Sequence, residues 1–583
     1  MDIKELHEQA LLLFSKRVSL LLLWQEIAEN FYPERADFTF RRTLGTDFAA
    51  NLMTSYPIMC RRDLGDQIST MLRPTAKAWS HTRVKDPLRE DNDAKRWLQW
   101  ADTVMRRAMY DKRTMFTKAT KEADHDYASF GQAVLTVRIN KTRDRLLYQC
   151  WHLRDVAWME NEEGKICTIF RKWKPTVRDL KRLFGDKVAP QVDQILAQNK
   201  PFEEVECMHM IVDMDMYDGE IDSYDVGPDG NTKSVRRGAS AAERKRYPYV
   251  SIYYDTVHSK MIEAVATWNQ EYVIPRWQTV SGSQYGFSPA TVAALPDGRL
   301  LQAMMYTILE AGEKATNPPL IATVDAVKSD IEVFAGATTW VDRDYDERMG
   351  DALRPITQDL RGMPIGRDLL SDSRAMLLQA FYLNKLTLPQ RSPEMTAYEV
   401  GQRVQEYIRG ALPIFEPMEM EYNGGICEAT FEILRRYGAF GSPMDMPPTL
   451  HGADIEFHFE SPLHDAIEAQ KGQTFLEMKG MIAAAMEMDQ SVAALPDAVV
   501  ALRDVLDGIG VPAKWVRSEI SVKQIQDAHN AAAQAQQALA AMESGSKTVG
   551  NLADAAKSAS DAQGGTTPLA RPMPAPQPIA QVG

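Results

Sequence analysis

The sequence has few cysteines and no long apolar run. Five cysteines are scattered through 583 residues, and no two of them stand at C-x-x-C spacing. Such a set predicts neither a disulfide framework nor a zinc site, so we interpret the cysteines as small buried residues in a reducing compartment. Charged residues interrupt the leucine-rich N-terminus, and no small-residue cleavage site follows it. The sequence therefore predicts an amphipathic helix there, with neither a membrane span nor a secretory leader.

Positive charge is also in short supply. The chain has 67 lysine and arginine residues against 80 aspartate and glutamate residues, which gives a net charge of −13. Proteins that bind DNA tightly on their outer surface are usually basic, so this balance argues against a repressor or a nucleoid protein. A surface that repels phosphate is compatible with a wall along which DNA slides without sticking.

Recognisable catalytic and metal-binding motifs are missing as well. The nearest approach to a phosphate-binding loop, residues 545–548, lacks both the glycine before its lysine and a preceding strand, which argues against a nucleotide-driven motor. Asp342, Asp344 and Asp346 have the spacing of a calcium loop, but the glycine and the final glutamate of that motif are absent. We interpret this run as a solvated acidic surface. The sequence predicts no enzyme, no cofactor and no metal site.

What is present predicts an α+β protein that is mostly helical. A chain of 583 residues is too long for one hydrophobic core, so we expect two to four domains or sub-domains. Residues 1 to about 130 have helical periodicity. Between about 131 and 280, short alternating segments rich in β-branched and aromatic residues predict an antiparallel sheet, with a helix near residues 177–184. Long helices and small antiparallel sheets should therefore coexist.

The most informative stretch runs from Tyr285 to Gly438. Its first helix should end at Asn317-Pro318-Pro319, because proline cannot continue a helix. A Thr-Ala-Tyr-Glu capping box at Thr396 predicts the beginning of a very long helix. The predicted order is helix, compact insert, helix, basic loop with two prolines, and long helix, at residues 297–316, 319–364, 367–382, 384–395 and 396–438.

This order resembles the stem, clip, stem, tunnel-loop and wing-helix succession of phage portal proteins. More narrowly, it resembles the head-to-tail connectors of short-tailed phages, which have a similar G-x-S segment before the first stem helix and a T-A-x-E segment after the tunnel loop. Here these segments are Gly286-Phe287-Ser288 and Thr396–Glu399. The resemblance covers most of residues 1–540. It implies a portal fold with a wing at 1–296, a first stem helix at 297–318, a clip at 319–364, a second stem helix at 365–383, a tunnel loop at 384–395, a long wing helix with a returning strand at 396–461, a helical crown at 462–543 and a disordered tail at 544–583.

The resemblance also implies which residues carry the function. In connectors the loop after the second stem helix projects into a central channel, which would let Lys385 and Arg391 contact phosphates without reading bases. A solvated loop with two incidental cations is the alternative. The clip of connectors contacts the neighbouring subunit, the packaging motor and later the tail adaptor. A clip surface for the terminase or the adaptor is thereby implied for Asp342, Asp344, Asp346 and Arg348.

The function implied by the resemblance is that of a ring, of about twelve copies, at one vertex of the capsid. The ring would admit double-stranded DNA during packaging and release it at ejection. The implied partners are further copies of the chain, transiently and non-specifically bound DNA, the large terminase subunit, the tail adaptor, the scaffold and the major capsid protein, with no membrane. We expect assembly in the host cytoplasm and a final location in the virion. The alternatives are a capsid or tail-tube component without a DNA channel, and a nucleic-acid enzyme that uses the acidic clusters.

Overall fold

The computed structural model describes residues 1–41, 52–75, 77–86, 91–140, 142–226, 232–316, 318–322, 340, 353–355, 362–386, 410, 414–442 and 445–459, with scattered positions between 475 and 537. The chain divides into two units, Met1–Glu90 with Ala94–Val511, and Asp91–Asp93 with Pro512–Gly583. Between 515 and 537, the described residues of the second unit are mostly helical. No helix within the described ranges is long and apolar enough to cross a membrane. Most of the predicted crown and all of the predicted tail lie outside these ranges.

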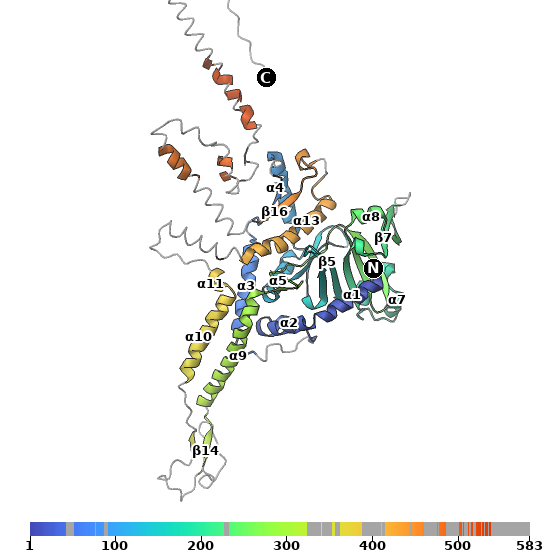
Figure 1. The fold of residues 1–583 in the computed structure, drawn as a ribbon. Coiled ribbons are helices and arrows are strands. Elements are labelled where there is room, and N and C mark those ends of the chain that lie inside the picture. The colour runs from blue at the N-terminus through green and yellow to red at the C-terminus, as the bar shows by residue number, and fades with distance from the viewer. Residues whose placement is uncertain are drawn as a thin grey trace, which may run out of the picture. The chain divides into compact units, whose positions relative to one another are not determined.

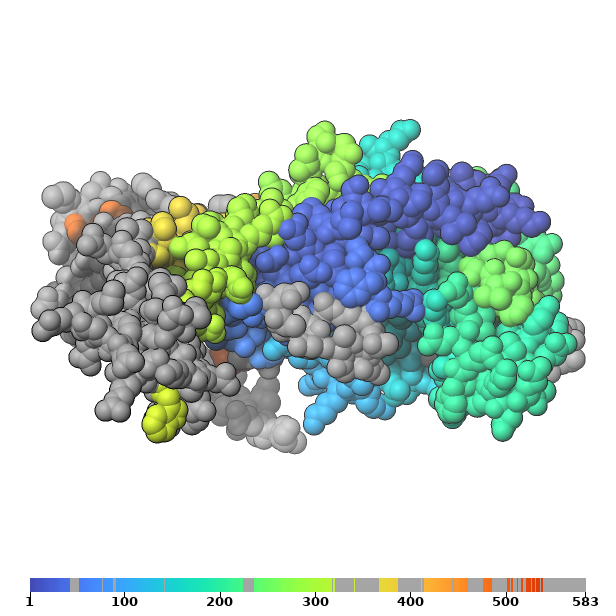
Figure 2. All heavy atoms as spheres, turned by 90° about the horizontal axis from the view of Figure 1, so that it is seen from below, coloured from blue at the N-terminus to red at the C-terminus, as the bar shows by residue number. Residues whose placement is uncertain are grey.

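The N-terminal region is helical, as predicted. Asp2 caps the first helix through a capping box, in which its side chain accepts hydrogen bonds from the backbone of Lys4 and Glu5 and the Glu5 carboxylate accepts one from the Asp2 N–H. This first helix and the next lie at the surface in Figure 2, where they are drawn in blue. The helices of this region are α1 (Ile3–Lys16), α2 (Val18–Phe31), α3 (Tyr56–Leu72), α4 (Asn92–Met109) and α5 (Phe116–Phe130).

The strand-rich region predicted over about 131–280 is present, and its named strands pair antiparallel. One sheet has the order β10-β9-β6-β5-β4, and a second has the order β11-β2-β3. Their bounds are β2 (Val134–Ile139), β3 (Leu146–Trp151), β4 (Val156–Glu160), β5 (Ile166–Trp173), β6 (Cys207–Asp213), β9 (Tyr249–Asp255), β10 (Lys260–Thr267) and β11 (Tyr272–Val273). Two smaller pairs join β7 (Glu220–Val226) to β8 (Thr232–Gly238) and β12 (Gln278–Thr279) to β13 (Gly286–Phe287).

Three short helices accompany these strands: α6 (Val177–Phe184), α7 (Pro190–Ala197) and α8 (Ala241–Arg246). The first is the helix predicted near 177–184, and the Thr176 side chain caps it by accepting from the Asp179 N–H. The returning strand is β16 (Ile455–Phe459), which pairs antiparallel with β1 (Ser80–Val84). These two strands form a separate sheet, and the stacking of Trp79 on Phe459 at 6.4 Å supports that pairing.

The two helices predicted as the stem are α9 (Pro289–Thr316) and α10 (Gly362–Ala380), which lie side by side in Figure 1. We keep the name stem helices for this pair. Between them, β14 (Leu320–Ala322) pairs antiparallel with β15 (Leu353–Pro355). The first stem helix begins at Pro289 and not at 297, because burial of its first turns outweighs the single hydrogen bond lost at the internal Pro296. The second begins at Gly362 and not at 365, since Pro364 falls in the first turn, where its missing N–H costs nothing.

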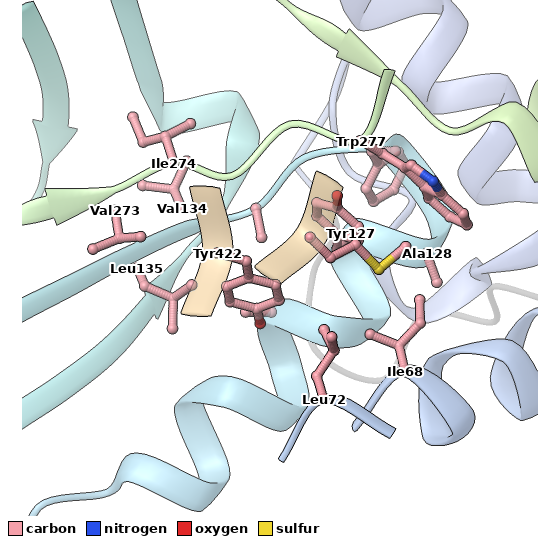
Figure 3. Packing of buried hydrophobic residues seen from close by; sticks show 14 of the residues in the cluster. Ile68, Leu72, Tyr127, Ala128, Val134, Leu135, Val273, Ile274, Trp277 and Tyr422 are labelled. Carbon is pink, nitrogen blue, oxygen red and sulfur yellow. The ribbon is translucent and has the colours of Figure 1, made fainter. Parts of the chain in front are cut away.

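One large cluster of buried residues joins the helices α2 to α5, the strands β2 and β3, the stem helices and α13 (Gly425–Arg436). Near its centre the Tyr127 ring stacks on Trp277 with centroids 5.5 Å apart, and it lies 5.5 Å from the Tyr422 ring (Figure 3). Leu301 of α9 and Leu377 of α10 are fully buried in the same cluster. The stem helices are therefore anchored in the core that carries the strands.

Candidate functional site

The stem helices approach each other closely at Gly366, which has no side chain. A Cβ on Gly366 of α10 would lie 3.3 Å from Cδ1 of Ile308 on α9, so a larger residue would push the helices apart at this point. Toward the core, Leu301, Leu370 and Leu377 are buried. The stem helices are thus packed into the core at one end, and the β14–β15 pair lies at the other end in Figure 1.

Among the side chains that the structure describes, seven large apolar ones on α9 and α10 are exposed, and four of these are at least half exposed. Tyr306 and Leu309 of α9 are 56% and 50% exposed, and Leu369 and Met376 of α10 are 50% and 58% exposed. Exposed apolar side chains gathered on one pair of helices are typical of a surface that another protein covers. We call these four side chains the exposed stem residues.

The structure places Lys385 in a short helix, α11 (Leu383–Leu386), and not in a loop. Tyr382 adopts the left-handed conformation with φ of 58°, which ends α10, and the burial of Leu383 fixes the helical turn that follows. The Lys385 side chain is exposed, and its Nζ lies 5.9 Å from the centre of the Tyr382 ring. Residues 384–386 of the expected loop are therefore helical, and the rest of that segment lies outside the described residues. Lys385 is an exposed cation near the end of the described range 362–386.

The other predicted site residues fall outside the described part of the chain. Arg391 of the tunnel loop is one of them. The same holds for the four predicted clip residues, Asp342, Asp344, Asp346 and Arg348. Their assignments stay predictions. In the described ranges, no group of three or more histidine, cysteine, aspartate or glutamate side chains could hold a metal ion.

The long helix predicted from Thr396 is helical where the structure describes it, but it is interrupted. A π-helix occupies Glu419–Gly424, directly before α13. The wider turn directs Tyr422 and Asn423 into the core, where both are fully buried. Such single-turn π-helices occur frequently at functional sites.

Tyr422 and Asn423 complete a buried ionic network with α3 and α5. Arg73 pairs with Asp124, and it donates a hydrogen bond of 2.8 Å to the side-chain oxygen of Asn423. The Tyr422 hydroxyl donates to the same Asp124 carboxylate at 2.7 Å. Burial raises the pKa of the Tyr422 hydroxyl well above its ordinary value, so it stays a donor. The network ties the helix that follows the predicted tunnel loop to the end of α3.

Glu419, at the start of the π-helix, should make the stability of the fold depend on pH. Burial, together with the nearby Glu416, raises the pKa of its carboxyl to about 7. Between its ordinary pKa and 7, the folded chain retains a proton that the unfolded chain releases, so stability is lost as pH rises through this window. Glu419→Gln should flatten the fall in unfolding free energy between pH 5 and pH 8, measured by urea denaturation. Equal slopes in this variant and in the wild type would contradict the assignment, and Glu8→Gln, on exposed α1, is the control.

Sequence reasoning missed the network of Arg73, Asp124, Tyr422 and Asn423. Its members lie as far as 350 positions apart, and no local periodicity marks a π-helix. The one available signal was that Asp124 shares a helix face with Thr120, Tyr127 and Ala128. A carboxylate on the buried side of such a helix requires a cationic partner.

Comparison with known proteins decides the family. Residues 4–516 match the family of bacteriophage head to tail connecting proteins. The chain belongs to this family. It is therefore a head-to-tail connector and a structural component of the virion, and the alternative of a capsid or tail-tube component is not favoured.

Individual relatives of the connector cover most of its length. The portal protein of Salmonella phage epsilon15 is 21% identical over 566 residues, which are 94% of this chain and 95% of the relative. A probable portal protein of Bordetella phage BPP-1 is 23% identical over 469 residues, 78% of each chain. Among solved structures, a chain in the virion of a native gene transfer agent particle is 9% identical with a TM-score of 0.30, covering 78% of this chain and 94% of that one.

Proposed function

We propose that this connector is a portal protein that assembles into a closed ring of about twelve copies at one capsid vertex. Double-stranded DNA would enter through the ring during packaging and leave through it at ejection. The family match over residues 4–516 and the two portal relatives are the observation that carries this proposal. We further propose that assembly takes place in the host cytoplasm, together with the scaffold and the major capsid protein.

The exposed stem residues support the ring. Tyr306 and Leu309 on one stem helix and Leu369 and Met376 on the other are each at least half exposed in the single chain. Copies arranged side by side around an axis would cover them, because a cyclic ring joins one face of each copy to a different face of the next. Apolar surface buried in this way contributes about 25 cal/mol per Å².

The channel wall is expected to be acidic with few cations, so that DNA moves along it with little friction. In this proposal Lys385 at the base of the tunnel loop, and Arg391 within it, provide weak phosphate contacts that a ring repeats in every copy. The clip, with Asp342, Asp344, Asp346 and Arg348, would bind first the large terminase subunit and then the tail adaptor.

Changing Lys385 and Arg391 together to alanine should reduce DNA packaging or retention severalfold while leaving rings intact. The reason is that phosphate contacts contribute to affinity in proportion to the number of cations, and the ring multiplies each loss. The readout is the fraction of DNA-filled heads, counted by electron microscopy and by nuclease-protected DNA. A matched control replaces Lys4 and Lys16, exposed lysines of α1, by alanine. Normal filling in the Lys385 and Arg391 variant would contradict the proposed role of the loop.

A further inference from the structure

A cationic groove lies between the two larger sheets, beside α6 and the end of α13. It has a volume of about 1010 Å³, and strands β2, β3, β5, β9 and β10 contribute to its lining (the region of β5 in Figure 1). Six lysine and arginine residues line it against three aspartate and glutamate residues. In a chain with a net charge of −13, this excess of positive charge is a local exception.

Arg171 of β5 is the best-fixed cation in the groove. Only 2% of the residue is exposed, and its guanidinium lies 3.8 Å from the centre of the Trp151 ring. Its Nε donates a hydrogen bond of 2.7 Å to the Tyr272 hydroxyl. A guanidinium stacked on an indole and hydrogen-bonded at one edge is held in one orientation.

A buried chain of hydrogen bonds behind Arg171 reinforces that orientation. Since the Tyr272 oxygen accepts from Arg171, its own O–H donates to Nδ1 of His209 at 2.7 Å. The His209 Nε2–H then donates to the Ser251 hydroxyl at 2.8 Å. Burial lowers the pKa of His209 well below its ordinary value, and the neighbouring Arg171 lowers it further, so the ring is neutral as this arrangement requires.

Three buried polar atoms of the groove lack hydrogen-bond partners within the part of the chain that the structure describes. They are Nη1 of Arg171, Oγ1 of Thr267 and Nδ2 of Asn269. Leaving such a group unpaired costs about 1–3 kcal/mol, and more for a charged group. Glu271 also lines the groove, but its carboxyl makes no hydrogen bond to Nη1 of Arg171. Burial raises the pKa of Glu271, and the nearby Arg138 and Arg171 only partly oppose this shift. Three such unpaired groups around one groove indicate that another molecule supplies their hydrogen-bond partners.

We propose that this groove receives an acidic segment of the neighbouring copy in the ring, with a carboxylate of that segment bound by Arg171 and Asn269. A carboxylate accepts several N–H bonds and pairs with the planar face of a guanidinium better than other peptide groups do. The neighbouring copy is the occupant because a head-to-tail ring brings a second, different face of the same acidic chain against each copy. The inference rests on the ring proposed above.

Arg171→Met tests the groove without removing the side chain that packs on Trp151. For a single copy, the change removes the hydrogen bond to Tyr272 and a cation near Glu271, so the unfolding free energy should fall, and it is measured separately on single copies. In the ring, the same change should raise the concentration at half-dissociation about tenfold or more, measured by mass photometry, because a carboxylate loses its partner. Asn269→Ala should act in the same direction. Arg237→Met is the matched control, since Arg237 pairs with Glu243 of its own chain.

Carbodiimide crosslinking of rings mixed from isotopically light and heavy copies identifies the occupant. Lys174 lines the groove and pairs with Glu206 of its own chain, so a same-copy link between them is the internal control. We expect in addition a light-to-heavy link from Lys174 to a second acidic peptide, weakened by Arg171→Met. Intact rings with only same-copy links, and unchanged dissociation of Arg171→Met rings, would overturn the inference while the ring itself stands.

A fluorescent glutamate-rich octapeptide separates this inference from the proposed function. If single copies bind the peptide through Arg171 but the wild type forms no ring, the ring proposal fails and a different protein is the occupant. If rings form, two results together support the neighbouring copy as the occupant. Single copies should bind the peptide in a way that depends on Arg171, and ring assembly should compete with that binding. Duplex DNA that displaces the peptide from intact rings would overturn the assignment of a peptide occupant.

Discussion

Replacing Arg73 by methionine is expected to lower the free energy of unfolding by about 3–5 kcal/mol, the cost of leaving a buried carboxylate without its counter-charge. Asp124 is fully buried, and its partners are Arg73 and the Tyr422 hydroxyl. The methionine fills most of the space, so the loss reports on the charge and not on a cavity. Urea denaturation followed by tryptophan fluorescence measures it.

The matched double variant makes this prediction specific. Adding Asp124→Leu to Arg73→Met removes the stranded charge and should restore most of the lost stability. Arg113→Met, which breaks an exposed pair with Asp111, should change stability little. A loss as large in the double variant as in the single one would show that packing around Tyr422, and not the ion pair, stabilises this junction.

Tyr306→Glu combined with Leu309→Glu should abolish ring assembly and leave the single copy folded. Both side chains are at least half exposed in the chain, so the new charges remain solvated there. In a ring that covers the stem, each charge would be buried without a partner, at a cost of about 3–5 kcal/mol. We expect the concentration needed for half-assembly to rise by at least roughly 100-fold, since each 1.4 kcal/mol is a factor of ten.

Two comparisons make the stem result interpretable. Phe202→Glu places a charge on a residue that is 74% exposed in the loop after α7, and it should leave assembly unchanged. Tyr306→Phe with Leu309→Met keeps the exposed stem apolar and should assemble like the wild type. Rings that form normally with both glutamates present would exclude the exposed stem residues from the subunit interface.

Sequence patterns predicted the elements whose causes are local. The helix α6 (Val177–Phe184) was predicted within its bounds, and the structure shows local causes for it: Thr176 caps it, and Gly185 at positive φ follows its last residue. The strands of the wing followed from their alternation, and the order of the stem helices followed from the prolines and the insert between them. These signals lie within a few residues of the structure that they determine.

Features set by tertiary contacts were not predictable in this way. The first stem helix was predicted to begin at residue 297, but burial of Ala290, Ala294 and Leu295 extends α9 back to Pro289. Lys385 was expected in a loop, yet the buried Leu383 makes its segment helical. The π-helix at Glu419–Gly424 depends on partners about 300 positions away, which no window of sequence contains.

The groove around Arg171 could not be predicted from the sequence either. Basic and aromatic residues on β3, β5 and the segment after β10 gave no signal, because only the packing of two sheets brings them together. The unpaired Nη1 of Arg171 is visible only once its neighbours are in place. Site residues of this kind require the fold before they can be recognised.

The most direct test of the central claim is the mass of the purified protein in solution, with negative-stain images of the same sample. About twelve copies of a 65.7 kDa chain would give a particle of about 790 kDa with a central hole, which is the predicted result. A closed dimer or tetramer without a hole would contradict the account.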